Sequence, residues 1–246
     1  MSDTNLYIYG RKPVEEALKD EAERVDKIFV RNSVSNSSIQ EIVDTASAHR
    51  IPVNYVPGNK LYDLVGKVND QGVVALLSAV KYEEFEDWIE TVDTDDNPAI
   101  LLLDEIEDPH NVGAILRTAA AAGIAAVLVP KHRQAPINAT VYKTSAGTAG
   151  RIPIVRVGNL NQTILQLKDH GFWLAGLDQD GEKELWEQLF DMPMAFVIGN
   201  EGKGIRKKTL EHCDFTITIP MENEVPSLNA SVSAALICYE WRRRRK

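Results

Sequence analysis

Short apolar runs alternate with amphipathic segments along most of the chain. In the first third, the apolar runs are brief and are bounded by Gly, Pro or polar residues, as is typical of strands. The segments between them space their apolar residues three or four apart, as helices do. The pattern predicts strands at Lys27–Arg31, Val53–Val56 and Gly72–Leu77 and helices at Pro13–Leu18 and Ser38–His49. Together these elements form a small α/β unit.

From Ala99 onward the alternation continues on a larger scale. Buried-type strands are predicted at 99–104, 125–130, 172–178, 195–199 and 215–219, and helices at 109–122, 160–170, 185–189 and from Ser227 to the end. Asp108 is a suitable cap before Pro109, and Gly123 can end that helix. Ser227 is the expected N-cap of the last helix. Regular strand–helix alternation indicates a parallel sheet covered on both faces, hence an α/β fold.

The formal charge of −9 is concentrated in one short stretch. Residues 83–98 contain eight acidic residues and no basic one, whereas residues 1–82 carry −1 and residues 99–246 carry 0. Both flanking blocks can therefore display basic patches, and the acidic balance does not exclude a nucleic-acid partner. We predict an N-terminal domain at 1–82, an acidic linker at 83–98 and a second domain at 99–246.

Composition places the protein among globular proteins of the cytoplasm. Hydrophobic residues make up 44% and charged residues 26% of the 246 positions, and no apolar run approaches the ~18 residues of a membrane span. The N-terminus lacks the apolar core of a signal peptide. Cys213 and Cys238 lack metal-ligand spacing, which indicates buried reduced thiols. The five His are scattered, so we predict no metal site.

Three segments near the C-terminus carry the candidate chemistry. The strands at 195–199 and 215–219 and the last helix all end or begin in Gly, Ser, Asn and Glu, so they predict a crevice at the carboxyl edge of the sheet. The hexamer GNEGKG at 199–204 matches neither the P-loop nor the Rossmann pattern. Its glycines suit either a backbone turn that approaches a ligand closely or an ordinary surface turn.

The remaining candidates each have a structural alternative. SLNAS at 227–231 could bind an anion at a helix start or be a plain cap. Asn111 could belong to a functional site at the helix start or help to cap the helix. Arg117 could belong to the same site or form a surface ion pair. These two residues lie six apart and do not share one helix face. The RRRRK tail is either a solvated helix end or a phosphate-binding patch.

Taken together, three motifs in register resemble a known family. DPHNVGAILRTA, FVIGNEGKGI and IPMENEVPSLNASVSAALICYE closely resemble the three signature motifs of the SpoU (TrmH-type) RNA ribose 2′-O-methyltransferases of the SPOUT superfamily. The chain looks most like the RlmB-type members, which act on guanosine in 23S rRNA. YGRKPVEEAL and NDQGVVA resemble the linked N-terminal substrate-binding domain, which is similar to a ribosomal protein. The likeness covers nearly the whole chain except the acidic stretch.

The resemblance implies a catalytic domain whose C-terminal segment is threaded into a trefoil knot. It also implies S-adenosylmethionine as the cofactor, RNA as the substrate and a homodimer that buries the C-terminal helix. By analogy, backbone groups at the second and third motifs hold the cofactor, with the Thr144–Thr148 loop nearby. The implied cofactor-binding residues are Gly199, Ile219, Leu228, Thr144, Gly147 and Ile198.

Five positions of this chain match the residues that the family places at the reacting end of the site, where the methyl group is transferred. They are Arg117, Asn111, Glu201, Ser227 and Asn229. Pro226 departs from the family pattern, in which many relatives have a small or polar residue before the serine. A guanidinium does not release its proton in proteins, so we expect Arg117 to pin a phosphate and stabilise the developing alkoxide.

The resemblance also implies a division of labour between the two domains. The N-terminal domain would choose the substrate, with Arg11, Lys12 and Arg31 on the RNA backbone. A tRNA 2′-O-methyltransferase, a non-catalytic RNA-binding relative and a nucleotide-binding enzyme of different chemistry are the alternatives. The joint presence of the five reacting-end residues disfavours the second, and the failed P-loop and Rossmann patterns disfavour the third.

Overall fold

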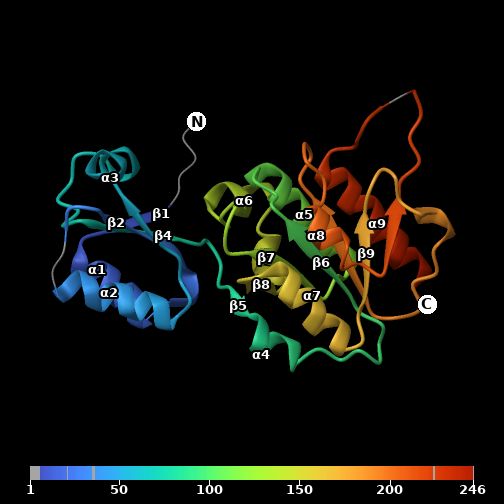
Figure 1. The fold of residues 1–246 in the computed structure, drawn as a ribbon, viewed down its shortest axis with the longest axis horizontal. Coiled ribbons are helices and arrows are strands. Elements are labelled where there is room, and N and C mark those ends of the chain that lie inside the picture. The colour runs from blue at the N-terminus through green and yellow to red at the C-terminus, as the bar shows by residue number, and fades with distance from the viewer. Residues whose placement is uncertain (1–5, 21, 35–36, 224, 246) are drawn as a thin grey trace. The chain divides into compact units, whose positions relative to one another are not determined.

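The protein folds as two compact units, each with its own sheet (Figure 1). The structure is a computed structural model that describes residues 6–245 apart from residues 21, 35, 36 and 224. Unit 1 contains the described residues up to Lys81 together with Pro136–Thr140, and unit 2 contains Tyr82–Ala135 and the described residues from Val141 onward. None of the helices in these ranges has both the length and the apolarity that crossing a membrane requires.

Unit 1 is a four-stranded sheet in the order β1-β4-β2-β3. Only β2 and β3 run parallel, and β4 is antiparallel to both of its neighbours. Apolar residues of α1 and α2 pack on one side of β2 and β4, whereas α3 lies on the other side (Figure 1). Its elements are β1 (Leu6–Tyr9), α1 (Arg11–Asp20), a 3₁₀ turn (Ala22–Arg24), β2 (Val25–Arg31), α2 (Ser37–Ala48), β3 (Val53–Val56), α3 (Gly58–Val65) and β4 (Val73–Leu77).

Unit 2 is an eight-stranded parallel sheet in the order β10-β12-β9-β11-β6-β7-β8-β5. The predicted α/β fold with a parallel sheet is therefore confirmed. The elements are β5 (Glu83–Glu84), α4 (Phe85–Ile89), β6 (Ala99–Asp104), α5 (Pro109–Ala122), β7 (Ala126–Pro130), α6 (Ala139–Thr144, whose first two residues belong to unit 1), a 3₁₀ turn (Thr148–Arg151), β8 (Ile154–Val157), α7 (Leu160–Asp169), β9 (Trp173–Leu177), β10 (Lys183–Glu184), a 3₁₀ turn (Leu185–Glu187), β11 (Met194–Gly199), α8 (Lys207–Leu210), β12 (Phe215–Thr218) and α9 (Ala230–Arg244).

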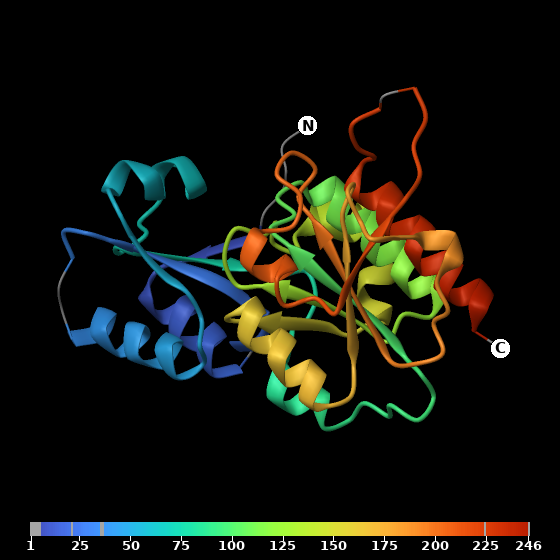
Figure 2. The same ribbon diagram turned by 45° about the vertical axis from the view of Figure 1, so that its right-hand side comes forward.

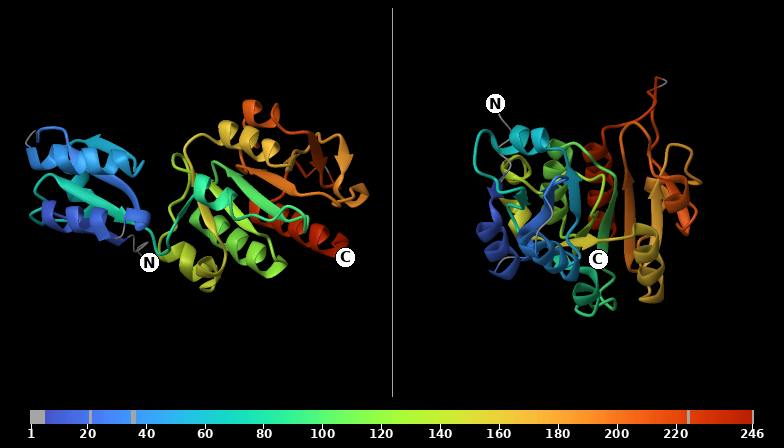
Figure 3. Two further views of the ribbon diagram at one scale, coloured as in Figure 1. Left: turned by 90° about the horizontal axis from the view of Figure 1, so that it is seen from below. Right: turned by 60° about the vertical axis from the view of Figure 1, so that its left-hand side comes forward.

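Helices cover both faces of this sheet, because its central strands are apolar on both sides. Helices α5 and α9 lie side by side on one face (Figure 2), and α4 and α7 pack on the other (Figure 3). All six residues of β6 are buried. As predicted, Asp108 caps α5 by accepting a hydrogen bond from the amide of His110 at 2.8 Å, and Gly123 ends it with φ 81°.

The acidic stretch at 83–98 differs from the connector that the charge pattern indicated. Glu83 and Glu84 form β5 beside β8, and α4 buries Phe85, Trp88 and Ile89 in the same core cluster as β6 and β7. Three apolar residues at helical spacing are sufficient to fix the segment to the sheet despite its charge. Residues 83–89 are therefore part of unit 2.

Three further features differ from or add to the expectations. The cap of α9 is Asn229 rather than Ser227, because the Asn229 Oδ1 accepts hydrogen bonds from the amides of Ser231 and Val232. Helix α3, over GNKLYDLV, was not predicted. Cys213 is half-buried and Cys238 is buried, both are free thiols, and burial raises the pKa of each to about 12.

Candidate active site

A cavity of about 390 Å³ opens where β9, β11 and β12 end and α9 begins. In a parallel sheet, the carboxyl ends of the strands share one edge, so three loops distant in sequence meet there. The wall combines apolar side chains with a glycine-rich backbone, which is the usual make-up of a small-molecule site. The predicted crevice at this edge is thus present in the structure.

Six of the predicted site residues line this cavity together. Two of them, Glu201 and Ser227, belong to the predicted reacting end, and the other four belong to the predicted cofactor set. They are Ile198, Gly199, Glu201, Ile219, Ser227 and Leu228. Pro226, which departs from the family pattern, also lines the wall.

A chain of hydrogen bonds connects the three motifs beside the cavity. The side-chain Nδ2 of Asn111 donates to the Glu201 carboxylate, and the Asn229 Nδ2 donates to the Asn111 Oδ1 at 2.9 Å. The Asn229 Oδ1 in turn caps α9 through the amide of Ser231 at 2.9 Å. Asn111 is only 8% exposed, so its amide plane is fixed by a donor on one side and an acceptor on the other. This chain positions the Glu201 carboxylate, which lines the cavity.

Gly199 permits the tight turn that carries Glu201. A Cβ at this position would lie 2.3 Å from both the Gly204 carbonyl carbon and the Ile205 nitrogen, so any larger residue would displace backbone. Asn200 and Gly204 close the turn with paired backbone hydrogen bonds. By contrast, a Cβ at Gly202 would approach only the Asn200 side chain, at 3.6 Å. The first glycine of the hexamer is therefore required sterically, and Gly202 is not.

A buried carboxylate that the sequence analysis missed holds the same loop. The Asp104 side chain, 0% exposed at the end of β6, accepts hydrogen bonds from the Arg206 backbone at 2.9 Å and its Nε at 2.7 Å. Arg206 also lies 3.2 Å from Glu105, whose carbonyl accepts a hydrogen bond from Asn200. The signal in the sequence is an acidic residue directly after a fully apolar strand, where a parallel sheet collects its polar groups.

Five predicted residues lie outside the cavity wall: Asn111 and Asn229, which reach it through the hydrogen-bond chain, and Arg117, Thr144 and Gly147. Arg117 is exposed on α5 and, among the residues that the structure describes, forms no hydrogen bond or ion pair. Thr144 packs against the start of α5, because a Cβ on Gly113 would come within 2.7 Å of the Thr144 Cβ. Gly147 has φ 77° in the turn that follows α6. The structure therefore brings the second and third motifs together with Asn111, but not with Arg117.

Part of the cavity wall was not anticipated from the sequence. Asp178 follows β9, and its amide donates to the Ile217 carbonyl at 3.0 Å, which draws the loop after β9 against β12. The polar run DQD, which begins with the last residue of the predicted strand at 172–178, is the signal that could have identified it. The unanticipated wall residues before the glycine loop and after β12 are Leu177, Asp178, Gln179, Asp180 and Met221.

A second hollow of about 530 Å³ lies along the outer sides of α5 and α9. Its lining is largely apolar and includes Val232 and Tyr239, which are both about half exposed. At its far end, Arg243 and Arg244 bind Glu240, and the Arg243 hydrogen bond lowers the pKa of that carboxyl. Arg245 pairs with Asp96, and Lys246 lies outside the described residues. Much of the arginine tail is thus engaged by acidic and carbonyl groups.

Comparisons with known proteins agree with this geometry. Residues 98–239 match the family described as SpoU rRNA Methylase, and residues 7–83 match the RNA 2′-O ribose methyltransferase substrate-binding family. A Staphylococcus haemolyticus protein with a provisional TrmH family tRNA/rRNA methyltransferase name is 39% identical, over 98% of this chain and 96% of its own. The Bacillus subtilis protein YacO, which also has a provisional TrmH family tRNA/rRNA methyltransferase name, is 38% identical, over 100% of this chain and 98% of its own.

Solved structures extend the likeness to the fold. The SpoU methyltransferase AviRb of Streptomyces viridochromogenes has a TM-score of 0.63 and 25% identity, over 98% of this chain and 90% of AviRb. AviRb has also been solved in complex with the cofactor AdoMet. The similarity spans both units of the chain.

Proposed function

Because this chain belongs to the SpoU family of RNA methyltransferases, we propose that it transfers a methyl group from S-adenosylmethionine to a ribose 2′-hydroxyl of RNA. The observation that supports this most directly is the hydrogen-bonded chain Glu201–Asn111–Asn229 beside the cavity. It joins all three family motifs next to a space of suitable size for a cofactor. A non-catalytic relative would have no need to keep these side chains together.

The cavity suits an adenosyl cofactor by its chemistry. Ile198, Ile219 and Leu228 offer apolar surface for a flat base, and the glycine turn at Gly199 presents backbone groups without a side chain in the way. The adjacent Asp178 offers a carboxylate, the group that commonly binds ribose hydroxyls in α/β sites. When bound, the cofactor supplies an electrophilic methyl group on a positively charged sulfur.

We assign the reacting end to the side chains around Glu201. Asn111 and Asn229 orient the Glu201 carboxylate, which can accept a hydrogen bond from a ribose hydroxyl and hold it in line. Ser227 lines the same wall and positions RNA or cofactor. Arg117, whose guanidinium is free of partners among the described residues, binds a substrate phosphate and stabilises the alkoxide as it forms, while a phosphate oxygen or water takes the hydroxyl proton. Thr144 lies beside the start of α5, and it and the Gly147 turn would close the site from that side.

We propose a guanosine of 23S rRNA as the target, in line with the RlmB-type motifs, with a tRNA as the alternative. The relatives carry names that include both classes of RNA. Unit 1 matches a substrate-binding family, so we assign it the choice of RNA. Both the RNA and the cofactor belong to the cytoplasm, where we expect the enzyme to act.

We further propose that the enzyme is a homodimer through α5 and α9, with a trefoil knot in its C-terminal segment. The exposed apolar hollow along these helices supports the dimer, because such patches mark protein interfaces. Thr118, the residue after Arg117, lines that hollow, so a dimer formed there would enclose Arg117. The knot rests on membership of the SpoU family.

A methyl-transfer assay tests the proposal. Purified protein is incubated with tritiated S-adenosylmethionine and either ribosomal or transfer RNA, and the modified ribose is mapped. We expect tritium in one 2′-O-methylguanosine of 23S rRNA. Label in tRNA alone would select the alternative target, label on a base would refute ribose chemistry, and RNA binding without any label would identify a non-catalytic relative.

A further inference from the structure

A third hollow, of about 610 Å³, lies within unit 1 at one end of its sheet. Arg11 follows the end of β1, Arg31 ends β2, and residues 68–72 lead into β4, so these segments meet at the same edge. Val34 and Val68 supply apolar surface. The hollow is separate from the cavity of unit 2 and uses none of its residues.

The floor of this hollow is a fixed ion pair. The Arg31 Nη2 lies 2.6 Å and 2.8 Å from the two Asp70 oxygens, and the Asp70 side chain is only 7% exposed. Asp70 also accepts a hydrogen bond from the Gly72 amide at 2.7 Å. Gly72 has φ 85°, and a Cβ there would lie 2.7 Å from a Val34 methyl group. The turn is therefore locked by a charge pair and by a backbone position that only glycine fills easily.

Several donors around the hollow lack acceptors. Among the described residues, the Nε atoms of Arg11 and Arg31 are buried without a hydrogen-bond partner. The Gln71 Oε1 accepts from the Arg11 backbone amide at 3.0 Å, so the free side of that amide group is its Nε2 donor. Buried donors without acceptors are unfavourable, and a rotation of the Arg11 guanidinium would aim its Nε at a bound acceptor while Arg31 keeps its ion pair with Asp70.

We propose that this hollow binds an unpaired nucleobase of the RNA that presents carbonyl acceptors, namely guanine or uracil. This inference rests on the proposed function, because it assumes that the substrate is RNA. The Asp70 carboxylate in the wall disfavours a phosphate, and Arg31 is already neutralised by it. A base has a flat apolar face for Val34 and Val68 and an acceptor edge for Arg11 and Gln71. Arg11 and Arg31 would thus read a base rather than the RNA backbone.

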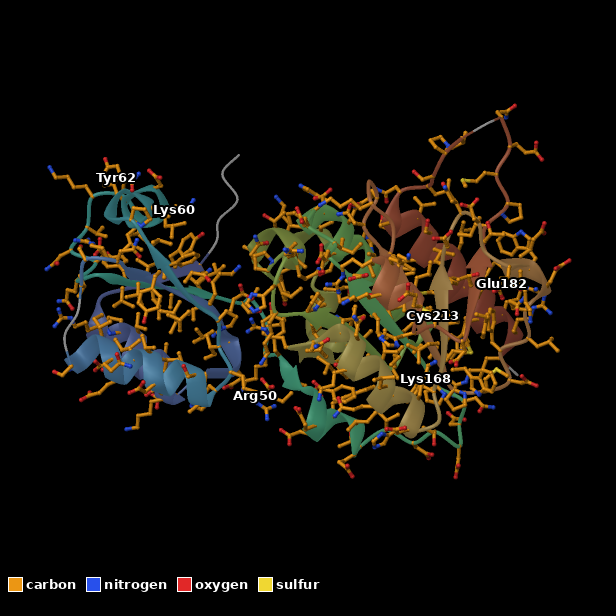
Figure 4. The ribbon with its side chains drawn as sticks, viewed as in Figure 1. Arg50, Lys60, Tyr62, Lys168, Glu182 and Cys213 are labelled. Atoms are coloured by element: carbon orange, nitrogen blue, oxygen red, sulfur yellow. The ribbon has the colours of Figure 1, made fainter. Side chains whose placement is uncertain are left out.

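The neighbouring helix α3 can engage the adjacent nucleotides. It begins at Gly58, where a Cβ would lie 3.5 Å from the Arg31 side chain, so the helix borders the hollow. Lys60 and Tyr62 project from α3 toward solvent (Figure 4), and Tyr62 is 58% exposed. A lysine offers a phosphate contact and a free tyrosine ring offers stacking, which are the usual means of holding single-stranded RNA.

Titration of the full chain by NMR tests the base pocket directly. The probes are guanosine, uridine, adenosine and inorganic phosphate, and the signals are the Nε–H groups of Arg11 and Arg31 and the Gln71 side-chain amide. We expect guanosine and uridine to shift these signals at millimolar concentration, adenosine to do so less, and phosphate not at all. Shifts by phosphate that equal or exceed those by guanosine, or no shifts with any probe, would overturn the proposal.

A variant that introduces a negative charge provides the specificity test. Gln71→Glu keeps an oxygen for the Arg11 amide but replaces the donor with a carboxylate. We expect the affinities for guanosine and uridine to fall at least about fivefold, because the new carboxylate repels the carbonyl oxygen that the Gln71 donor would bind. The matched control Gln40→Glu, on α2, introduces the same charge and loses a hydrogen bond to Asp44, and it should leave both affinities unchanged. Equal effects of the two variants, or no change in Gln71→Glu, would refute the pocket.

The methyl-transfer assay separates this inference from the proposed function. A protein that methylates RNA while its Arg11, Arg31 and Gln71 signals stay silent would refute the base pocket alone. A protein whose hollow binds guanosine but which transfers no methyl group to either RNA would refute the proposed function and leave the pocket in place.

Discussion

The Asn229 Nδ2 donates to the Asn111 Oδ1 at 2.9 Å, across 118 positions of sequence. The same Asn229 caps α9 through its other amide atom. One side chain therefore sets both the start of the last helix and the orientation of the amide that binds Glu201.

These two roles of Asn229 can be separated by substitution. Asn229→Ala removes the cap and the bond to Asn111, and should lower the free energy of unfolding by about 1 kcal/mol. Asn229→Asp keeps the capping oxygen but sets a carboxylate oxygen against the Asn111 Oδ1, so it should lose less stability than Asn229→Ala while losing the bond to Asn111. We expect both variants to lose at least tenfold in methyl transfer, measured with urea unfolding in parallel. Full activity in Asn229→Asp would show that the bond to Asn111 does not serve the reaction.

Substitution of Arg117 tests the role that we propose for its guanidinium. Arg117→Ala should lower methyl transfer at saturating RNA by about 100-fold or more, because one preorganised charge at a developing anion is worth that much. Cofactor affinity, measured by calorimetry, should stay within about twofold, since Arg117 is absent from the cavity wall. Arg117→Lys, which keeps the charge but not the planar fork, should recover part of the rate. An equal loss of cofactor binding would make Arg117 a binding or folding residue.

The two glycines of the turn form a matched pair. A Cβ at Gly199 would meet backbone at 2.3 Å, whereas at Gly202 the nearest atom is a side-chain oxygen at 3.6 Å. Gly199→Ala should therefore weaken S-adenosylmethionine binding at least tenfold and lower the melting temperature. Gly202→Ala should change neither the S-adenosylmethionine affinity nor the melting temperature by much. Similar calorimetric titrations for the two variants would contradict the close backbone approach as the reason for the first glycine.

We expect the start of the acidic stretch, residues 83–89, to stabilise the hydrophobic core of unit 2 despite its negative charge. Trp88 is 3% exposed within the cluster that covers β6 and β7, so Trp88→Ala should cost about 3–5 kcal/mol of unfolding free energy. Trp173→Ala is the control, because that ring is 49% exposed and its loss should cost little. Comparable urea midpoints for the two variants would restore the interpretation of 83–98 as a linker.

Stability should depend on pH through Glu240. The Arg243 and Arg244 hydrogen bonds lower the pKa of the Glu240 carboxyl below its ordinary value of 4.5. A lowered folded-state pKa contributes stability above the unfolded-state value, and this contribution is lost as pH falls through the folded value. Glu240→Gln should therefore destabilise the protein by about 1–2 kcal/mol at pH 7. The difference from wild type should shrink below pH 4.5 in thermal unfolding, and a constant difference down to pH 3 would contradict it.

Much of the sheet of unit 2 was predictable, because buried parallel strands such as Ala99–Asp104 are continuous apolar runs bounded by Gly, Pro or acidic residues. Helix α3 was not, since GNKLYDLV opens with residues that favour turns and its stability comes from burying Leu61. The charge of residues 83–98 concealed three core side chains. The net charge of a segment is set by its charged, mostly exposed residues, so it does not indicate whether the apolar residues of the same segment are buried.

The candidate site was predictable in part. Residues on strand ends, such as Gly199 and Ile219, could be grouped because the sheet order gathers them at one edge. The link from Asn111 to Asn229 could not, because no local pattern pairs two asparagines so far apart. The same holds for the buried pair of Asp104 and Arg206, which depends on how the chain returns to β6.

The order of the wall residues along the chain has a consequence for biosynthesis. The cavity is built from residues between Leu177 and Ser233, whereas the sheet of unit 1 ends at Leu77. A ribosome therefore releases the sheet of the RNA-selecting unit more than a hundred codons before the donor pocket can close. On the roles proposed for the two units, a nascent chain stopped short of Asn229 would bind RNA without modifying it.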